Sequence, residues 1–219
     1  MKDRYSVAVG LIFVVLIVFV TIQTLGGDGG GGTLGLDRRE ARWPLPEFAV
    51  PVAAAELEGD ANVAQDDCGL AAVPCPEEAS RTPACRISPA ETIRVCDLFD
   101  LPLVISFWFT KGGSCPGQQD VVDAVSRRYR DRVNFLSINI HDDRDEVRDL
   151  VEEHGWSMPV GYDRDGAVGA LYGVGGCPTF AYAFPGGTLH GASTGVLDER
   201  ELSVRVDELL DATRAAREG

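Results

Sequence analysis

The feature that most constrains this chain is a regular alternation of two residue patterns over its second half. Short apolar runs of strand length alternate with longer stretches of helical period, which is typical of parallel strands joined by helical crossovers. The expected order is strand 103–109, helix 115–130, strand 133–140, helix 144–154, a strand near 159, strands at 179–184 and 188–194, and a last helix at 198–214. Pro185, Gly186 and Gly187 form a hairpin turn. The sequence therefore predicts an α/β domain.

The N-terminal segment has a different character. No charged residue occurs between Tyr5 and Gly27, and residues 6–25 are mostly apolar, which is about the length that crosses a bilayer core. We expect a single-pass transmembrane helix that contacts the lipid bilayer; the alternative is a cleaved signal peptide, for which this apolar run is long. All six cysteines follow it, which favours an oxidising, extracytoplasmic side. The expected location is the cell membrane, with the C-terminal domain outside.

Composition divides the chain into four parts. Residues 1–27 form the tail and membrane helix, and 28–44 form a glycine-rich flexible tether. Residues 45–98 hold a first strand and an irregular, disulfide-stapled segment, and 99–219 form the α/β core. The formal net charge of -14 argues against a nucleic-acid partner, because affinity for a phosphate backbone comes mainly from Lys and Arg.

Cys115 is the leading candidate for chemistry. It stands in the stretch FWFTKGGSCPG, where an apolar strand runs through a turn into a helix that begins at the cysteine. Pro116 supports this placement, since proline is tolerated in the first turn of a helix. A helix start offers unpaired N–H groups and the positive end of the macrodipole, and both stabilise a sulfur anion over the neutral thiol. The alternative is a buried, inert thiol.

A second cysteine, Cys177, directly precedes a proline in VGGCPTF. Together, the F-W run, the turn ending in Cys115 and the Y-G-V-x-G-x-P-T-F run resemble the thioredoxin superfamily, specifically TlpA-type membrane-anchored disulfide reductases and related redoxin domains. PEFAVP (46–51) and PVGYDRDGAVGALYGV (159–174) are similar to neighbouring parts of that family, so the resemblance covers roughly residues 44–217. It implies a three-layer α/β/α sandwich with a mixed sheet.

One departure from the family pattern dominates the site. Where the family carries W-C-x-x-C, this chain has Lys111, Gly112, Gly113, Ser114 and Cys115, so Gly112 replaces the attacking first cysteine. Ser106 stands where many thioredoxins have a buried acid that moves a proton, and a serine cannot replace that base.

The resemblance also places the other site residues. It implies that Cys177 faces Cys115 within bridging reach, that Pro178 is cis, and that a substrate groove is lined by Trp108, Lys111, Gly112, Gly113, Ser114, Pro178 and Thr179. Three states of the cysteine pair stay open: a permanent structural disulfide, a reversible redox pair that replaces C-x-x-C, and two free thiols.

The four remaining cysteines are expected to form two structural disulfides. Three pairings are possible, of which we favour Cys68 with Cys75 and Cys85 with Cys96. Their spacings contain no C-x-x-C pair and therefore no zinc signature. No metal and no cofactor is expected.

Two functions follow from these observations. The first is thiol-disulfide exchange outside the membrane through Cys115, with Cys177 as its partner, acting on protein thiols or disulfides and supplied by a membrane electron donor. A variant of it is a one-cysteine redoxin-type peroxidase. The second is a non-catalytic, disulfide-stabilised thioredoxin-like domain that binds an extended partner in the groove.

Overall fold

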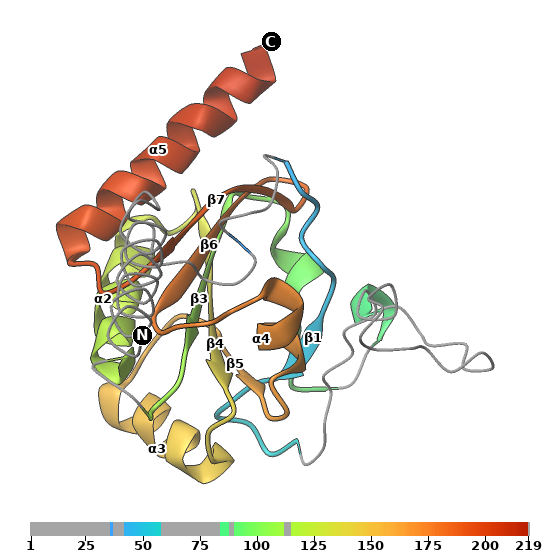
Figure 1. Ribbon diagram of the computed structural model, residues 1–219, viewed down its shortest axis with the longest axis vertical. Helices are drawn as coiled ribbons and strands as arrows, with labels where there is room; N and C mark the ends of the chain where they lie inside the picture. Colours follow the sequence, from blue (N-terminus) through green and yellow to red (C-terminus); the bar gives the residue numbers. More distant parts are fainter. Residues whose placement is uncertain (1–35, 37–41, 58–83, 88–89, 112–114, 219) are drawn as a thin grey trace, which may run out of the picture. The chain divides into compact units, whose positions relative to one another are not determined.

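The computed structural model describes residues 36, 42–57, 84–87, 90–111 and 115–218 (Figure 1). Its centre is a five-stranded sheet of order β5-β4-β3-β6-β7. The strands are β3 (Leu103–Trp108), β4 (Asn134–Ile140), β5 (Val160–Asp163), β6 (Thr179–Phe184) and β7 (Thr188–Thr194). The pairs β3–β4 and β4–β5 are parallel, whereas β3–β6 and β6–β7 are antiparallel. The mixed α/β sheet that the sequence predicts is therefore confirmed.

Capping residues explain where some of the described helices begin and end. They are α2 (Cys115–Arg128), α3 (Arg144–His154), α4 (Ala167–Tyr172) and α5 (Glu199–Glu218). Asp143 accepts hydrogen bonds from the first free N–H groups of α3, and α3 ends at Gly155, whose φ of 62° suits a residue without a Cβ. At the start of α5, Asp198 and Glu201 each accept the other's backbone N–H, which is a capping box.

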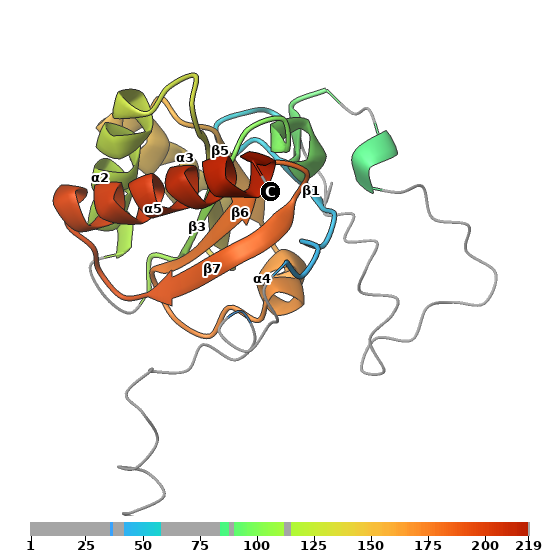
Figure 2. The same ribbon diagram turned by 90° about the horizontal axis from the view of Figure 1, so that it is seen from above.

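Three helices cover one face of the sheet. Alternation along β3 turns Val104 and Trp108 toward this face, where they join a core made with α2, α3 and α5. These three helices lie on one side of the sheet in Figure 2. Val122 of α2 and Leu202 of α5 are among its buried side chains. This face therefore holds the helix that begins at Cys115.

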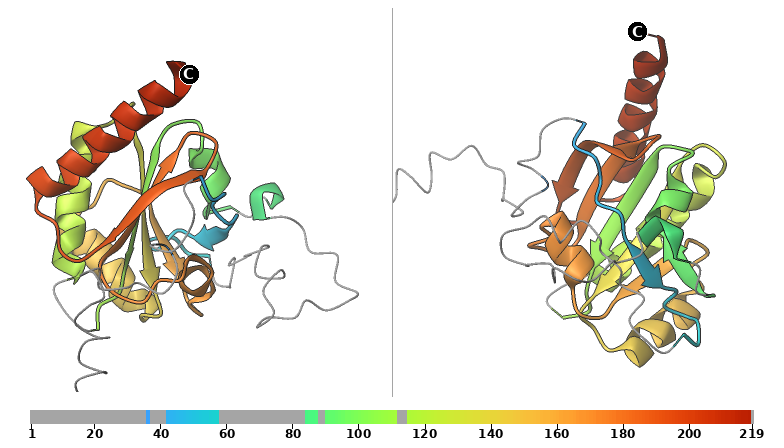
Figure 3. Two further views of the ribbon diagram at one scale, coloured as in Figure 1. Left: turned by 45° about the horizontal axis from the view of Figure 1, so that its top comes forward. Right: turned by 90° about the vertical axis from the view of Figure 1, so that its right-hand side faces the viewer.

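The opposite face is covered mainly by extended chain. Strand β1 (Ala49–Pro51) pairs with a short β2 (Thr92–Arg94), and the 3-10 helices η3 (Ala84–Arg86) and η4 (Val95–Leu98) flank β2. The segment 44–52 bridges β7 at one end and β5 at the other, so it crosses the whole sheet (Figure 3). Of the four α-helices among the described residues, α4 contributes to the core on this face. This layer is thus thinner than the second helical layer that a three-layer α/β/α sandwich would have.

The part of the chain that the structure describes contains no helix that is both long and apolar enough to cross a membrane. The expected membrane helix at 6–25 and most of the expected tether lie outside the described residues.

Candidate functional site

Cys115 and Cys177 form a disulfide in which the two Cα atoms are 6.1 Å apart. The sheet explains this proximity. Thr179, at the start of β6, pairs with Phe107, near the end of β3. Helix α2 begins just beyond the end of β3, so its first residue meets the residues that lead into β6. The prediction that the two cysteines lie within bridging reach is confirmed, since disulfides span Cα distances of about 4.4–6.8 Å.

The two sulfur-bearing residues differ in exposure. Cys115 is 2% exposed and belongs to the core beneath α2. Cys177 is only partly buried and packs against the edge of that core. The Cys177–Pro178 peptide bond is cis, as the resemblance implies. The carbonyl oxygen of Pro178 accepts a hydrogen bond of 3.0 Å from the backbone N–H of Gly195, which follows β7.

The residues expected to line the groove differ in how exposed they are. Lys111 is exposed, whereas Pro178 and Thr179 are buried, and the Thr179 hydroxyl donates to the Gly176 carbonyl. Trp108 and Thr179 are both completely buried; alternation along β3 turns the Trp108 indole inward, where it meets Trp156 edge to face. Gly112, Gly113 and Ser114 lie outside the described residues.

A buried network of hydrogen-bonded side chains lies one helical turn below Cys115. Gln119 donates to Ser106 Oγ over 3.1 Å and accepts from Ser137 Oγ over 2.9 Å. Ser137 Oγ in turn accepts from Trp108 Nε1 over 2.7 Å. All four side chains are fully buried, so these bonds satisfy groups that would otherwise be costly to bury. None of the four titrates near neutral pH, so this network supplies no acid or base beside the disulfide.

Asp142 fixes the chain that leaves β3. Its carboxylate accepts from the backbone N–H of Thr110 over 2.5 Å and from the Thr110 hydroxyl over 2.8 Å, and it also accepts from Asn139 Nδ2. The Tyr162 hydroxyl donates to the Asp142 carbonyl over 2.8 Å. Burial raises the pKa of Tyr162, which keeps this phenol a neutral donor. Thr110, which follows β3, is therefore held from β4 and β5.

A second anchor joins α2 to the segment that leads into the C-terminal helix. The Gln118 amide donates to the Leu197 carbonyl and accepts from the Leu197 N–H, both over 2.9 Å. Gln118 and Gln119 are almost completely buried. Sequence reasoning missed Gln118, Gln119 and Asp142. The signal for the glutamines was available, since positions 115, 118, 119 and 122 share one face of a helix and two of them carry amides.

The other described cysteines form the Cys85–Cys96 disulfide, with Cα atoms 5.9 Å apart, as predicted. It links η3 to η4, and Arg94 donates to the Ile87 carbonyl within the same loop. The Glu47 carboxylate lies close to both sulfurs, and a carboxylate with two cysteines could hold a metal ion. The two sulfurs are bonded to each other, however, so neither acts as a thiolate ligand. Cys68 and Cys75 lie outside the described residues.

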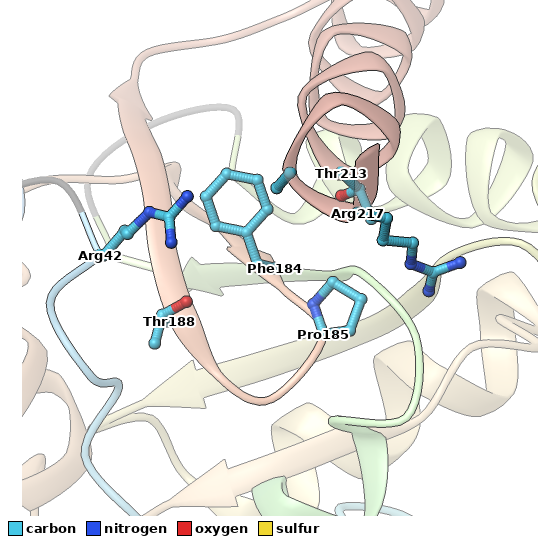
Figure 4. Close-up of a pocket in the computed structure, with 7 residues that line it drawn as sticks. Arg42, Phe184, Pro185, Thr188, Thr213 and Arg217 are labelled. Atoms are coloured by element: carbon cyan, nitrogen blue, oxygen red, sulfur yellow. The ribbon is translucent and has the colours of Figure 1, made fainter. Parts of the chain in front are cut away.

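The pocket in Figure 4 lies at the far end of β6 from the disulfide. It has a volume of about 240 Å³ and is lined by Arg42, Phe184, Pro185, Thr188, Thr213, Ala216 and Arg217. The side chains of Arg42 and Arg217 lie on opposite sides of Phe184 and Pro185 (Figure 4). Because the two guanidinium groups do not converge on one point, the pocket lacks the arrangement of an anion site.

Comparison with known proteins finds a curated relative that is similar in sequence and solved structures that share the fold. No family model matches the chain. The thiol-disulfide oxidoreductase ResA of Oceanobacillus iheyensis is 23% identical over 107 residues, which cover 48% of this chain and 56% of that protein. The match therefore spans little more than half the length of the curated relative.

Solved structures share the fold over more of the chain. A DsbF homologue from Corynebacterium diphtheriae has a TM-score of 0.58 at 17% identity and covers 83% of this chain and 96% of that one. A thiol:disulfide interchange protein of the thioredoxin family from Chlorobium tepidum has a TM-score of 0.56 at 14% identity, with coverages of 79% and 99%. At these identities the likeness concerns the fold, which is thioredoxin-like with a mixed sheet.

Proposed function

We propose that this protein exchanges disulfide bonds with protein thiols through the Cys115–Cys177 pair. The observation that carries the proposal is the position of the bridge, between the first residue of α2 and the residue before the cis-proline. Thiol-disulfide oxidoreductases are also the proteins that this chain resembles in sequence and in fold. The pair would stand in for the C-x-x-C that the sequence lacks.

The exchange conserves electrons between the two partners. A protein dithiol loses two electrons and two protons and becomes a disulfide, while the Cys115–Cys177 bond takes up both and becomes two thiols; the reverse direction uses the same atoms. No cofactor is needed, because the sulfur atoms themselves carry the electrons.

We place the domain outside the cell membrane, in the manner of the TlpA-type proteins. The apolar run at residues 6–25 and the six cysteines that follow it support this placement. The partners would be protein thiols or disulfides near the membrane surface, with a membrane electron donor. Protease added to intact cells, or to spheroplasts where an outer membrane is present, should remove the C-terminal domain. Full protection of the domain would contradict the placement.

The reduction potential of the pair is the direct test of the function. Catalytic couples lie between about -270 and about -120 mV, whereas structural bridges typically lie below about -300 mV. We expect a value in the upper range, measured by equilibration of the full chain in glutathione or dithiothreitol buffers with trapping of the free thiols. A parallel measurement on Cys85–Cys96 provides the control within the same molecule, since that bridge lies outside the site.

The second candidate is a non-catalytic thioredoxin-like binding domain. Two observations favour it: Cys115 is 2% exposed, and the network of Ser106, Gln119, Ser137 and Trp108 contains no proton acceptor of suitable pKa. An electrophilic thiol probe separates the two candidates. Labelling after mild reduction supports exchange, whereas labelling only after denaturation supports the binding domain. The peroxidase variant needs a free, accessible Cys115 thiol, and here that sulfur is bonded to Cys177.

A further inference from the structure

The two sulfurs of the bridge are not equally open to attack. Thiol-disulfide exchange proceeds by attack of a thiolate on one sulfur while the other leaves, so the accessible sulfur decides where the mixed disulfide forms. Cys115 is 2% exposed, whereas Cys177 is only partly buried at the edge of the core. A substrate sulfur therefore reaches Cys177 first.

Local electrostatics favour the same outcome. Cys115 is the first residue of the fourteen-residue helix α2, whose free N–H groups and dipole stabilise a negative sulfur. The Cys177 sulfur lies 3.9 Å from the carbonyl oxygen of Phe109, and a carbonyl dipole disfavours negative charge on it. When the bond opens, the electron pair is accommodated better on Cys115 than on Cys177. The buried sulfur is thus also the better leaving group.

We infer that Cys177, the residue before the cis-proline, is the sulfur that forms the mixed disulfide, and that Cys115 is the resolving thiol. This inference rests on the proposed function. It reverses the order of action expected from the sequence, in which Cys115 attacks and Cys177 is its partner. The more accessible sulfur, which Gly112 cannot supply, comes instead from Cys177 in the loop before β6.

The steps balance in atoms and electrons. A substrate thiolate bonds to Cys177 Sγ, the Cys115–Cys177 bond breaks, and its electron pair leaves on Cys115 Sγ. A second substrate thiolate then attacks the substrate sulfur of the mixed disulfide, and Cys177 leaves as a thiolate. The substrate becomes a disulfide and the pair becomes two thiols. In the opposite direction the same mixed disulfide on Cys177 is resolved by Cys115.

Trapping the mixed disulfide tests this assignment on the full-length chain. Cys115→Ser and Cys177→Ser are each treated with oxidised glutathione, and the adduct is located by peptide mapping and mass spectrometry. We expect Cys115→Ser to form the adduct on Cys177 at least about tenfold faster than Cys177→Ser forms it on Cys115, because access to the sulfur controls the rate. Near-UV circular dichroism checks that both variants are folded.

A second measurement avoids substitutions altogether. The oxidised wild-type protein is treated briefly with reduced glutathione, quenched in acid, and mapped for the cysteine that carries glutathione. An adduct on Cys177 supports the assignment. An adduct on Cys115 overturns the assignment while leaving the exchange function in place, and a folded protein in which neither cysteine carries glutathione and the bridge stays closed overturns both.

Discussion

The Cα atoms of Cys115 and Cys177 lie 6.1 Å apart although 62 positions separate the two residues in the chain. The sheet brings them together: β3 runs toward the edge where α2 begins, and β6 starts from the same edge in the opposite direction. The position of this bridge is therefore a property of the whole fold. The bridge in turn constrains the unfolded chain, and that constraint can be measured.

Removing each described disulfide should destabilise the protein by an amount that grows slowly, as the logarithm, with the length of the loop that it closes. In the chain-entropy model, the 62-residue separation of Cys115 and Cys177 corresponds to about 4 kcal/mol, and the 11-residue separation of Cys85 and Cys96 to about 3 kcal/mol. The double variants C115A/C177A and C85A/C96A should lose stability in that order in urea unfolding. A larger loss for C85A/C96A would show that native packing around that bridge outweighs loop closure.

Asp142→Asn should loosen the chain between β3 and α2. The carboxylate accepts from the N–H and the hydroxyl of Thr110 and from Asn139, and an amide cannot accept from all three without turning a donor toward one of them. We expect a loss of about 1–3 kcal/mol in the free energy of unfolding. The opening rate of the Cys115–Cys177 bridge by dithiothreitol should also rise.

Asp145→Asn is the matched control for that variant. Asp145 is an exposed acid on α3, paired with Arg148, and such surface pairs contribute at most about 1 kcal/mol. If both variants unfold at the same urea concentration as the wild type, Asp142 does not anchor the turn.

Gln119→Leu should show how much the buried hydrogen-bond network stabilises the protein. The substitution leaves the hydroxyls of Ser106 and Ser137 without their amide partner, which we expect to destabilise the protein by about 1–3 kcal/mol. Adding Ser106→Ala removes one of the two stranded hydroxyls, so the double variant should regain part of the loss. Equal stability of the single and double variants would mean that Ser106 is satisfied in another way. Ser106→Ala alone completes the double-mutant cycle.

His190 should make stability depend on pH. Burial lowers the pKa of His190 below its ordinary 6.5, against an opposing contribution from Glu208, so the folded protein favours the neutral ring. The unfolded chain takes up the proton near pH 6.5, whereas the folded chain does so only at lower pH. The free energy of unfolding should therefore fall as the pH drops below about 6.5.

His190→Gln tests this contribution. The variant keeps a polar side chain of similar length opposite Phe184 and has no group that titrates in this range. The difference in urea-unfolding free energy between wild type and variant should shrink as the pH falls from about 7.5 to about 5.5. A difference that stays constant over this range would assign the pH dependence to other groups.

Much of the core could be predicted because its signals are local. The apolar alternation of β3 and the capping residues Asp143 and Asp198 are visible in the sequence, and the helix and strand positions that follow from them agree with the structure to within a few residues. The proximity of Cys115 and Cys177 required the family resemblance as well, because no local pattern relates two residues so far apart.

What the sequence did not predict depends on tertiary packing. Strand β2 has three residues, too few for a periodic pattern, and it forms because β1 provides a partner. The segment 44–52 can lie close to β5 because Gly161 has no side chain; a Cβ there would be 2.5 Å from Val50 Cγ2. The inward turn of Trp108 and the buried amides of α2 likewise follow from which face of each element meets the core.

The bridge also determines how the domain would respond to a pulling force. Force applied between the two ends of the domain passes through the Cys115–Cys177 bond, so β4, α3, β5 and α4, which lie between the two residues, carry no load while the bond is closed. Once the bond opens, the 62-residue stretch can extend by on the order of 200 Å. The length of a stretched molecule would thus depend on whether the Cys115–Cys177 bond is oxidised or reduced.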